Sequence, residues 1–295
     1  MNILKNTINY YYNLNINTIH QKEKNYYFKV DNKNYLLLKY DNFEELDDIY
    51  KLGSYLNQFL PFHEIILNIN EEIITKINNN NYILLQIFIN DKINLNKIIE
   101  LNNINIPFNF PKLRRDDWSL LWTEKIDYLE YQLSQIGRKY PLIRDSFNYY
   151  IGLAENAIIL VNNTDKKDVV LSLSHRRISD SSFELYNPLN IVIDVRIRDI
   201  CEYFKYRFFH NIDISQELEL FLNYNHLNIN EGKLFLARML FPTYYFDIYE
   251  KIINNEIDES EIKKIIIKAD SYEKILKQIY YHFKNNQLNI EWLEH

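Results

Sequence analysis

The hydrophobic residues of this chain change their spacing near residue 90, and this change constrains the fold more than any other feature. Before it, short runs rich in Tyr, Ile and Leu are separated by Asn-rich turns, which is typical of β-hairpins. An amphipathic stretch with apolar residues at three-to-four spacing lies between two such pairs. The predicted elements, in order helix, strand, strand, helix, strand, strand, are Ile3–Leu14, Tyr26–Val30, Tyr35–Tyr40, Asn42–Phe59, Glu72–Ile77 and Tyr82–Ile89.

From Leu95 onward the spacing is helical, apart from an extended run at Asp168–Leu173 and a polar loop at Ser174–Ser182. The predicted helices are Arg114–Ile136, Leu142–Val161, Arg196–Phe209, Ser215–Tyr224, Gly232–Ile253, Glu259–Ala269 and Tyr272–Lys284. This pattern predicts an α+β fold with a small strand-rich lobe, residues 1–90, and a larger helical lobe, residues 91–295, which join near residues 88–92.

Glycine is scarce: the 295 residues include only four, at Gly53, Gly137, Gly152 and Gly232. Loops that cradle phosphates need glycines, because the backbone must approach the phosphate closely. The chain contains neither a GxGxxG motif nor a P-loop. If it binds a nucleotide, it does so without a glycine-rich loop.

Composition excludes several other classes of protein. The single cysteine, Cys201, rules out a disulfide framework and a multi-cysteine zinc site. A net charge of −6 argues against nucleic acid as the main partner, because that binding needs a basic surface. No apolar run approaches the ~18 residues of a membrane-spanning helix, and Met1–Lys24 lacks the continuous apolar stretch of a signal peptide. We expect a soluble, cytoplasmic protein.

Three long strings carry a resemblance to a known family: FNYYIGLAENAI at 147–158, RDICEYFKY at 198–206 and ARMLFPTYYF at 237–246. They resemble the spore coat kinase-like family typified by YutH, a relative of CotS, within the aminoglycoside phosphotransferase group of protein-kinase-like folds. The resemblance covers most of the chain in the same order. It implies a two-lobed kinase-like fold and a role in spore coat assembly, with coat proteins as partners and the spore coat as location if the source organism sporulates.

The same resemblance implies where phosphoryl-transfer residues would stand. Kinases of this fold carry a motif similar to HGD-x4-N, followed by an IDF-type aspartate. The first aspartate positions the acceptor hydroxyl, and the asparagine and the second aspartate hold magnesium. His175 stands at the position of the family histidine, but the catalytic aspartate position is Arg177. The metal asparagine position falls on Ser182, and the IDF aspartate position falls near Asn187. A guanidinium at the catalytic position reverses the charge where a proton acceptor is required.

A second register remains open. Residues 187–194, from Asn187 to Asp194, superficially resemble the metal-binding half HPxN-I-L-x-D. On that register the catalytic aspartate position is Leu185 and the histidine position is Phe183. Both registers lack the catalytic aspartate.

Lys39 ends a predicted strand at the place where a kinase keeps its phosphate-contacting lysine, and Glu44 or Glu45 follows on the next helix. We take Lys39 and Glu45 as candidate nucleotide-binding residues. The alternative is a solvated lysine at a strand end and an acid favoured by the positive end of the helix dipole.

Four residues around the polar loop have two interpretations each. Arg176 and Arg177 could bind an anion, or they could form internal ion pairs with Asp180 or Asp194. His175 could orient the loop through a hydrogen bond from its ring to the backbone, or it could be an exposed loop residue. For Asp199, the resemblance implies a carboxylate that ties the loop to the helical lobe, and the alternative is an ordinary acid at a helix N-terminus.

The sequence therefore predicts a catalytically degenerate kinase-like protein, a pseudokinase that serves as a scaffold or interaction module. No cofactor is expected, and ATP with magnesium would be needed only if the protein were active. The alternative is an active phosphotransferase on a small molecule or a protein, with Asp180 or Asp194 as displaced carboxylates. A third possibility is a nucleotide-binding regulator without transfer, which would need Lys39 paired with a helix acid.

Overall fold

The computed structural model describes residues 2–22, 24–88, 92–106, 109–284 and 290–294. The chain divides into two compact units. The first unit comprises residues 1–97, 105–114 and 175–193, and the second comprises residues 98–104, 115–174 and 194–295. The predicted join near residues 88–92 falls largely on residues 89–91, which lie outside the described residues, and the lobe boundary stays a prediction.

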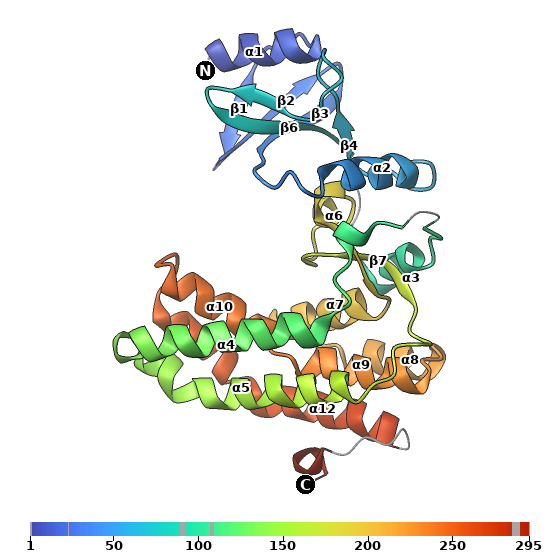
Figure 1. Cartoon of the computed structure of the whole chain (residues 1–295), viewed down its shortest axis with the longest axis vertical. Coiled ribbons are helices and arrows are strands. Elements are labelled where there is room, and N and C mark those ends of the chain that lie inside the picture. Colours follow the sequence, from blue (N-terminus) through green and yellow to red (C-terminus); the bar gives the residue numbers. More distant parts are fainter. Residues whose placement is uncertain (1, 23, 89–91, 107–108, 285–289, 295) are drawn as a thin grey trace. The chain divides into compact units, whose positions relative to one another are not determined.

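An antiparallel six-stranded sheet forms the centre of the first unit (Figure 1). The strands lie in the order β1-β2-β3-β6-β4, and β5 also pairs with β6. Their bounds are β1 Ile19–Lys22, β2 Asn25–Val30, β3 Lys33–Lys39, β4 Glu64–Ile66, β5 Thr75–Ile77 and β6 Asn80–Ile87. The strands β1 and β4, of four and three residues, are additions to the sequence prediction, and β5 is shorter than the predicted strand Glu72–Ile77.

Both predicted hairpin turns are confirmed, and each is a two-residue loop. Val30 pairs with Lys33 around Asp31 and Asn32, whose φ values are 47° and 65°. Ile77 pairs with Asn80 across a second turn whose two residues, 78 and 79, are both asparagines with φ of 48° and 63°. Asn and Asp tolerate this left-handed backbone at little cost, and the resulting twist matches that of the strands.

Two helices accompany the sheet in the first unit. Helix α1, Asn2–Tyr12, contributes Ile8 and Tyr12 to a core shared with Phe28, Leu37 and Leu84 of the strands. Tyr12 also exchanges a 2.8 Å hydrogen bond between its hydroxyl and that of Thr75.

Helix α2, Leu46–Leu56, is shorter than the predicted Asn42–Phe59. Glu45 is its N-cap residue, so Phe43 precedes the helix and is 47% exposed instead of buried. The rest of the first unit consists of short turns: η1 Pro111–Leu113, α6 Ser182–Leu185 and η3 Pro188–Asn190. Gly53 of α2 packs tightly on η3, since a Cβ there would lie 3.1 Å from Cβ of Pro188.

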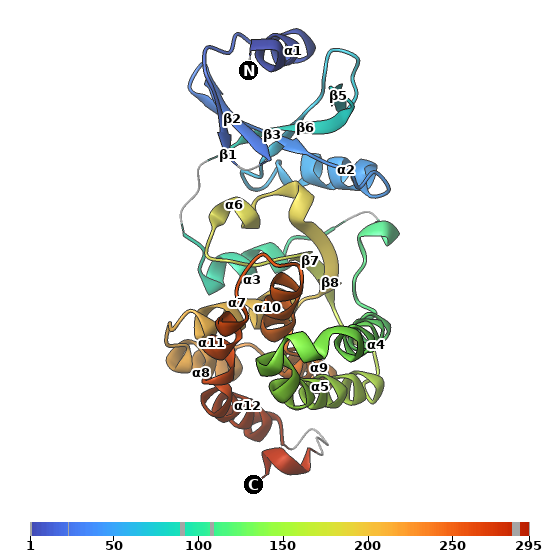
Figure 2. The same cartoon turned by 90° about the vertical axis from the view of Figure 1, so that its left-hand side faces the viewer.

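The second unit is helical, and α4 and α5 lie side by side along most of their lengths (Figure 2). Its α-helices are α4 Trp118–Ile136, α5 Pro141–Asn162, α7 Arg198–Phe209, α8 Ser215–Tyr224, α9 Ile229–Leu240, α10 Thr243–Ile253, α11 Lys263–Ile266 and α12 Ala269–Phe283. Helix α3, Leu95–Asn102, has residues 95–97 in the first unit and residues 98–102 in the second. Short 3₁₀ turns are η2 Gly137–Lys139, η4 Glu259–Ile262 and η6 Glu291–Leu293. A two-stranded sheet pairs β7, Leu171–His175, with β8, Ile191–Val195. None of the described helices is long and apolar enough to span a membrane.

The predicted helix Gly232–Ile253 is wrong as a single element, because it is divided into α9 and α10. Pro242 is the N-cap residue of α10, and proline cannot donate the backbone hydrogen bond that a continuous helix needs. The ammonium of Lys205 donates to the carbonyl oxygens of Arg238 and Phe241 at 2.9 and 3.3 Å, which satisfies groups left unpaired where α9 ends. The predicted helix Glu259–Ala269 likewise consists of η4 and the short α11.

Candidate functional site

His175 lies at the end of β7, and its ring is buried. Its Nε2 donates a 2.9 Å hydrogen bond to the carbonyl oxygen of Leu185. The structure therefore contains the bond from the ring to the backbone that one of the two sequence interpretations predicted. This bond fixes one side of the loop that runs from residue 176 to residue 190.

Asn190 holds the loop from its other end. Its Oδ1 accepts from the backbone N–H of Arg177 at 3.1 Å, and its Nδ2 donates to the carbonyl oxygens of Arg177 and Glu184 at 2.8 and 2.9 Å. Its own carbonyl oxygen accepts from the N–H of Arg176 at 2.8 Å. The side chain of Asn190 is buried and committed to the backbone of the loop.

Asn187, the candidate IDF position, also has a local partner. Its Oδ1 accepts from the N–H of Leu189 at 3.1 Å, which makes Asn187 the N-cap residue of η3. Asparagine favours this position because its side-chain oxygen satisfies an otherwise unpaired N–H. Ser182, the candidate metal asparagine position, is the first residue of α6.

Arg176 forms an ion pair with Glu45, which precedes α2. The side chains are 32% and 11% exposed, so the pair is partly sheltered from water. Burial raises the pKa of the neighbouring Tyr40 above its ordinary value, and the charges of Arg176 and Glu45 act on it in opposite directions. The side chain of Arg177, at the candidate catalytic position, is exposed.

The two candidate nucleotide-binding residues have different ion-pair partners. Glu45 pairs with Arg176, whereas the ammonium of Lys39 lies 4.0 Å from Oδ2 of Asp41. Both side chains of the Lys39–Asp41 pair are exposed, and such pairs contribute little to stability.

His63 is a buried residue that contacts the loop from residue 176 to residue 190, and the sequence did not indicate it. Its backbone N–H donates to the carbonyl oxygen of Tyr186 at 2.8 Å, and its ring packs on that of Phe183 with centroids 4.8 Å apart. Its Nδ1 accepts from the N–H of Phe88. Burial lowers the pKa of His63 to about 4, an effect that the backbone of Phe183 partly offsets. No local sequence pattern marks His63, since its contacts come from distant segments.

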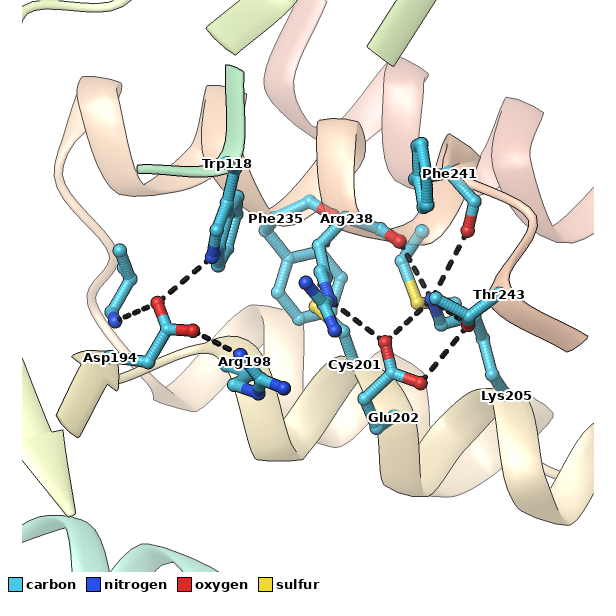
Figure 3. A network of polar contacts seen from close by, with 12 residues as sticks. Trp118, Asp194, Arg198, Cys201, Glu202, Lys205, Phe235, Arg238, Phe241 and Thr243 are labelled. Atoms are coloured by element: carbon cyan, nitrogen blue, oxygen red, sulfur yellow. Dashed lines mark hydrogen bonds and ion pairs between the residues drawn. The ribbon is translucent and has the colours of Figure 1, made fainter. Parts of the chain in front are cut away.

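Asp194, in the second unit, is fully buried and surrounded by donors (Figure 3). Its Oδ1 accepts from Nε1 of Trp118 at 2.9 Å and from the N–H of Val195 at 2.7 Å. Its Oδ2 forms an ion pair with Arg198. Asp199 is also buried, in the first turn of α7.

A second buried ionic cluster lies next to it, formed by Glu202, Lys205 and Arg238 (Figure 3). Oε1 of Glu202 lies 2.7 Å from both Nζ of Lys205 and Nε of Arg238. Burial alone would raise the pKa of Glu202, but Lys205 and Arg238 outweigh it and hold that pKa below its ordinary value. The guanidinium of Arg238 also lies over the ring of Trp118, 5.1 Å from its centroid. Sequence reasoning missed this cluster, because charged residues at helical spacing usually indicate a solvated face.

Among the described residues, no three His, Cys, Asp or Glu side chains come together as they would around a metal ion. The contacts that hold the loop from residue 176 to residue 190 include those of a buried histidine, two amides and the ion pair between Arg176 and Glu45. This arrangement can stabilise a loop.

An antiparallel sheet with its helix α2 and a helical second unit define the fold of aminoglycoside phosphotransferase-like kinases. An aminoglycoside phosphotransferase from Alicyclobacillus acidocaldarius superimposes with a TM-score of 0.67 at 12% identity, over 92% of this chain and 93% of that one. A spectinomycin phosphotransferase solved with ADP and spectinomycin gives a TM-score of 0.63 at 11% identity, over 99% of this chain and 96% of that one. The predicted fold class is confirmed.

Within that class, residues 5–279 match the family model described as "Spore coat putative kinase YutH", and the chain belongs to this family. The endospore coat-associated protein YutH of Bacillus subtilis (strain 168) is 29% identical over 188 residues. The aligned region covers 55% of this chain and 56% of that protein, so the chain spans little more than half the length of the curated relative that it matches. The predicted family is confirmed.

Proposed function

We propose that this chain is a pseudokinase: a kinase-fold protein without phosphoryl transfer that acts as a scaffold or interaction module. The observation that carries the proposal is the loop from residue 176 to residue 190. The resemblance puts Arg177 at its catalytic position, and the guanidinium there is exposed. A positive side chain cannot accept the proton of an acceptor hydroxyl, so the position has the wrong charge for the reaction.

The amides of the loop support the same proposal. Both Asn187 and Asn190 have their side-chain oxygens occupied by backbone N–H groups. An amide oxygen is a weaker magnesium ligand than a carboxylate, and each of these two oxygens already accepts a structural hydrogen bond. Neither candidate register therefore supplies a ready magnesium site within the loop.

Asp194 is the displaced carboxylate that an active enzyme would most readily recruit. It is fully buried and already has Trp118, Val195 and Arg198 as partners. Recruiting it to magnesium would break its ion pair with Arg198, whose side chain is only 12% exposed, and this is costly. This cost favours the scaffold over an active phosphotransferase.

The family gives the proposed setting. The relative in Bacillus subtilis is named as endospore coat-associated, and we extend that association to this chain: it acts in the cytoplasm of the sporulating cell and at the forming coat, with coat proteins as partners. No cofactor is needed for this role.

Isothermal titration with ATP, with and without magnesium, tests the proposal together with an ATPase assay. An active aminoglycoside phosphotransferase measured alongside serves as the positive control. We expect no magnesium-dependent binding and no turnover. Micromolar, magnesium-dependent binding with hydrolysis would establish the alternative, an active phosphotransferase with displaced carboxylates, and would overturn the pseudokinase.

A further inference from the structure

A short excursion of the chain, residues 67–74, separates β4 from β5. Both strands pair with β6, so the excursion leaves the sheet and returns to the same partner strand. Asn68 organises it from a buried position. Its Oδ1 accepts from the N–H groups of Asn70 and Glu72 at 2.9 and 3.1 Å, and its Nδ2 donates to the carbonyl oxygen of Ile74 at 3.1 Å.

The excursion forms one wall of a cavity of about 590 Å³. The other walls come from the end of α1, the segment before α2 and the first turn of α2. A backbone hydrogen bond of 2.8 Å from Ile69 to the carbonyl oxygen of Tyr11 fixes the excursion to α1. The residues that line the cavity include Tyr11, Phe43, Leu46, Asp47, Glu71 and Glu72. All of them belong to the first unit, and none is a candidate site residue.

The lining is chemically divided. Its more buried part is mostly apolar, with Leu46 buried and Tyr11, Ile73 and Ile74 half-buried. The exception is the buried amide of Asn68, which is hydrogen-bonded to the backbone of residues 70–74. Its exposed part carries the ring of Phe43 and three carboxylates, Asp47, Glu71 and Glu72, against one ammonium, that of Lys76. A ligand that fits must therefore present apolar side chains inward and positive charge outward.

The backbone of Glu71 has an unusual conformation for a glutamate. Glu71 has a φ of 61°, in the left-handed region. The other described non-glycine residues with positive φ are all asparagine or aspartate: Asn13, Asp31, Asn32, Asn78, Asn79, Asn211 and Asn255. Glutamate lacks the short side chain that eases this conformation, so it is strained where this Asn-rich chain elsewhere uses an unstrained residue.

We propose that this cavity binds a peptide segment of a partner protein in which lysine or arginine side chains alternate with aromatic or aliphatic ones. The apolar side chains contact Tyr11, Phe43 and Ile73, and the cations lie against Asp47, Glu71 and Glu72. This inference rests on the proposed function in one respect, since it names the kind of partner that the interaction module recognises.

The test uses the full chain and fluorescence anisotropy with three labelled twelve-residue peptides. In the first, lysine alternates with phenylalanine; the second has glutamate in place of lysine, and the third has serine in place of phenylalanine. We expect only the first to bind. The triple variant Asp47→Asn, Glu71→Gln, Glu72→Gln removes the negative charge and should weaken binding about tenfold, as expected for three exposed ion pairs. The variant Phe43→Ser should weaken binding with the charges intact.

The matched control is Glu44→Gln, Glu219→Gln, Glu256→Gln, which removes the same charge from exposed positions outside the cavity. It should bind like the unmodified chain. Equal weakening by both triple variants, equal binding of the lysine–serine peptide, or no binding of the lysine–phenylalanine peptide would each overturn the cavity proposal. Magnesium-dependent ATP hydrolysis by a chain that still binds the peptide would instead overturn the pseudokinase alone, so the two failures are distinguishable.

Discussion

Arg176 forms its ion pair with Glu45, a residue 131 positions earlier in the chain. An internal ion pair was one of the two interpretations of the loop arginines from the sequence, with Asp180 or Asp194 as partner. Arg176 does form an internal ion pair, but with Glu45. As a result, the glutamate that we considered as the partner of Lys39 instead connects the segment before α2 to the loop that follows β7.

Breaking this pair should destabilise the protein. Glu45→Gln leaves the partly sheltered guanidinium of Arg176 without its counter-charge, and we expect a loss of about 1–2 kcal/mol in the free energy of unfolding, between the values for exposed and buried pairs. Asp41→Asn, in the exposed pair with Lys39, is the control and should change it by less than about 0.5 kcal/mol. Urea denaturation measures both, and equal effects would show that the Arg176 pair is no better than a surface contact.

The two loop asparagines should differ in their contribution. Asn190→Ala removes three hydrogen bonds to backbone groups, which at about 1 kcal/mol each predicts a loss of about 3 kcal/mol. Asn187→Ala removes one capping bond and should cost about 1 kcal/mol, while Asn187→Ser keeps a capping oxygen and should cost less. Chemical denaturation of the three variants measures the order. An Asn190→Ala protein as stable as Asn187→Ser would contradict the view that Asn190 holds the loop.

His63 should make stability fall in mild acid. Its pKa is about 4 in the folded protein, against an ordinary value of 6.5 that applies to the unfolded chain. Between these two pH values the unfolded chain binds a proton at His63 and the folded chain does not. Above pH 6.5 His63 therefore does not lower the free energy of unfolding. As the pH falls toward 4 that free energy decreases, by about 2 kcal/mol between pH 7 and pH 5.

The comparison variant is His63→Gln, which keeps an acceptor for the N–H of Phe88 and cannot titrate in this range. Denaturation at pH 7, 6 and 5 should show a shallower pH dependence for the variant than for the unmodified chain. Parallel curves would mean that His63 accepts its proton readily in the folded state.

Lys205 should be among the most sensitive positions in the second unit. Its buried ammonium contacts Glu202 and the carbonyl oxygens at the end of α9. Lys205→Met therefore leaves the carboxylate of Glu202, whose side chain is 20% exposed, with one of its two cations removed. We expect a loss of about 3–5 kcal/mol. Lys264→Met, in an exposed pair with Glu261, should cost less than about 0.5 kcal/mol in the same thermal melts. A mild effect at Lys205 would indicate that water enters the cluster.

Glu71→Asn should increase stability while it removes a charge from the cavity. Asparagine tolerates the φ of 61° better than glutamate, and the expected gain is about 0.5–1 kcal/mol. The reverse change, Asn79→Glu, introduces glutamate at a φ of 63° and should lose a similar amount without affecting the cavity. Melting temperatures of the two variants test the strain directly, and a destabilised Glu71→Asn protein would refute it.

Features specified by neighbouring residues could be predicted from the sequence. The hairpin turns were predicted correctly, because Asp31, Asn32 and the two asparagines of the second turn favour a left-handed backbone by themselves. The division between α9 and α10 was missed although Pro242 signals it, because apolar spacing continues on both sides of the proline. The helix predicted from Asn42 was too long for a similar reason: Phe43 fits the apolar period, yet α2 begins only at Leu46.

The sequence indicated which residues belong to the candidate site better than it indicated their contacts. The family strings led to His175 and Arg177, and a backbone partner for His175 was one of the two interpretations considered. The partners of Arg176 and the burial of His63 depend on segments more than a hundred residues apart, for which a single sequence carries no signal. The cavity was not predicted either, because β4 was missed and the predicted strand Glu72–Ile77 included residues 72–74, which belong to the excursion.

The interruption between β4 and β5 also bears on how copies of such a protein can pack at high concentration. An unbroken outer strand presents a row of unpaired N–H and C=O groups to which a second chain can add. Here the strands beyond β6 are two pieces of three residues each, and the opposite outer strand, β1, has four residues, of which His20, Gln21 and Lys22 are exposed. Neither side of the sheet is a long template for backbone pairing. Assembly into a dense protein layer would therefore depend on specific side-chain contacts. Fibre growth by backbone pairing of the outer strands is disfavoured.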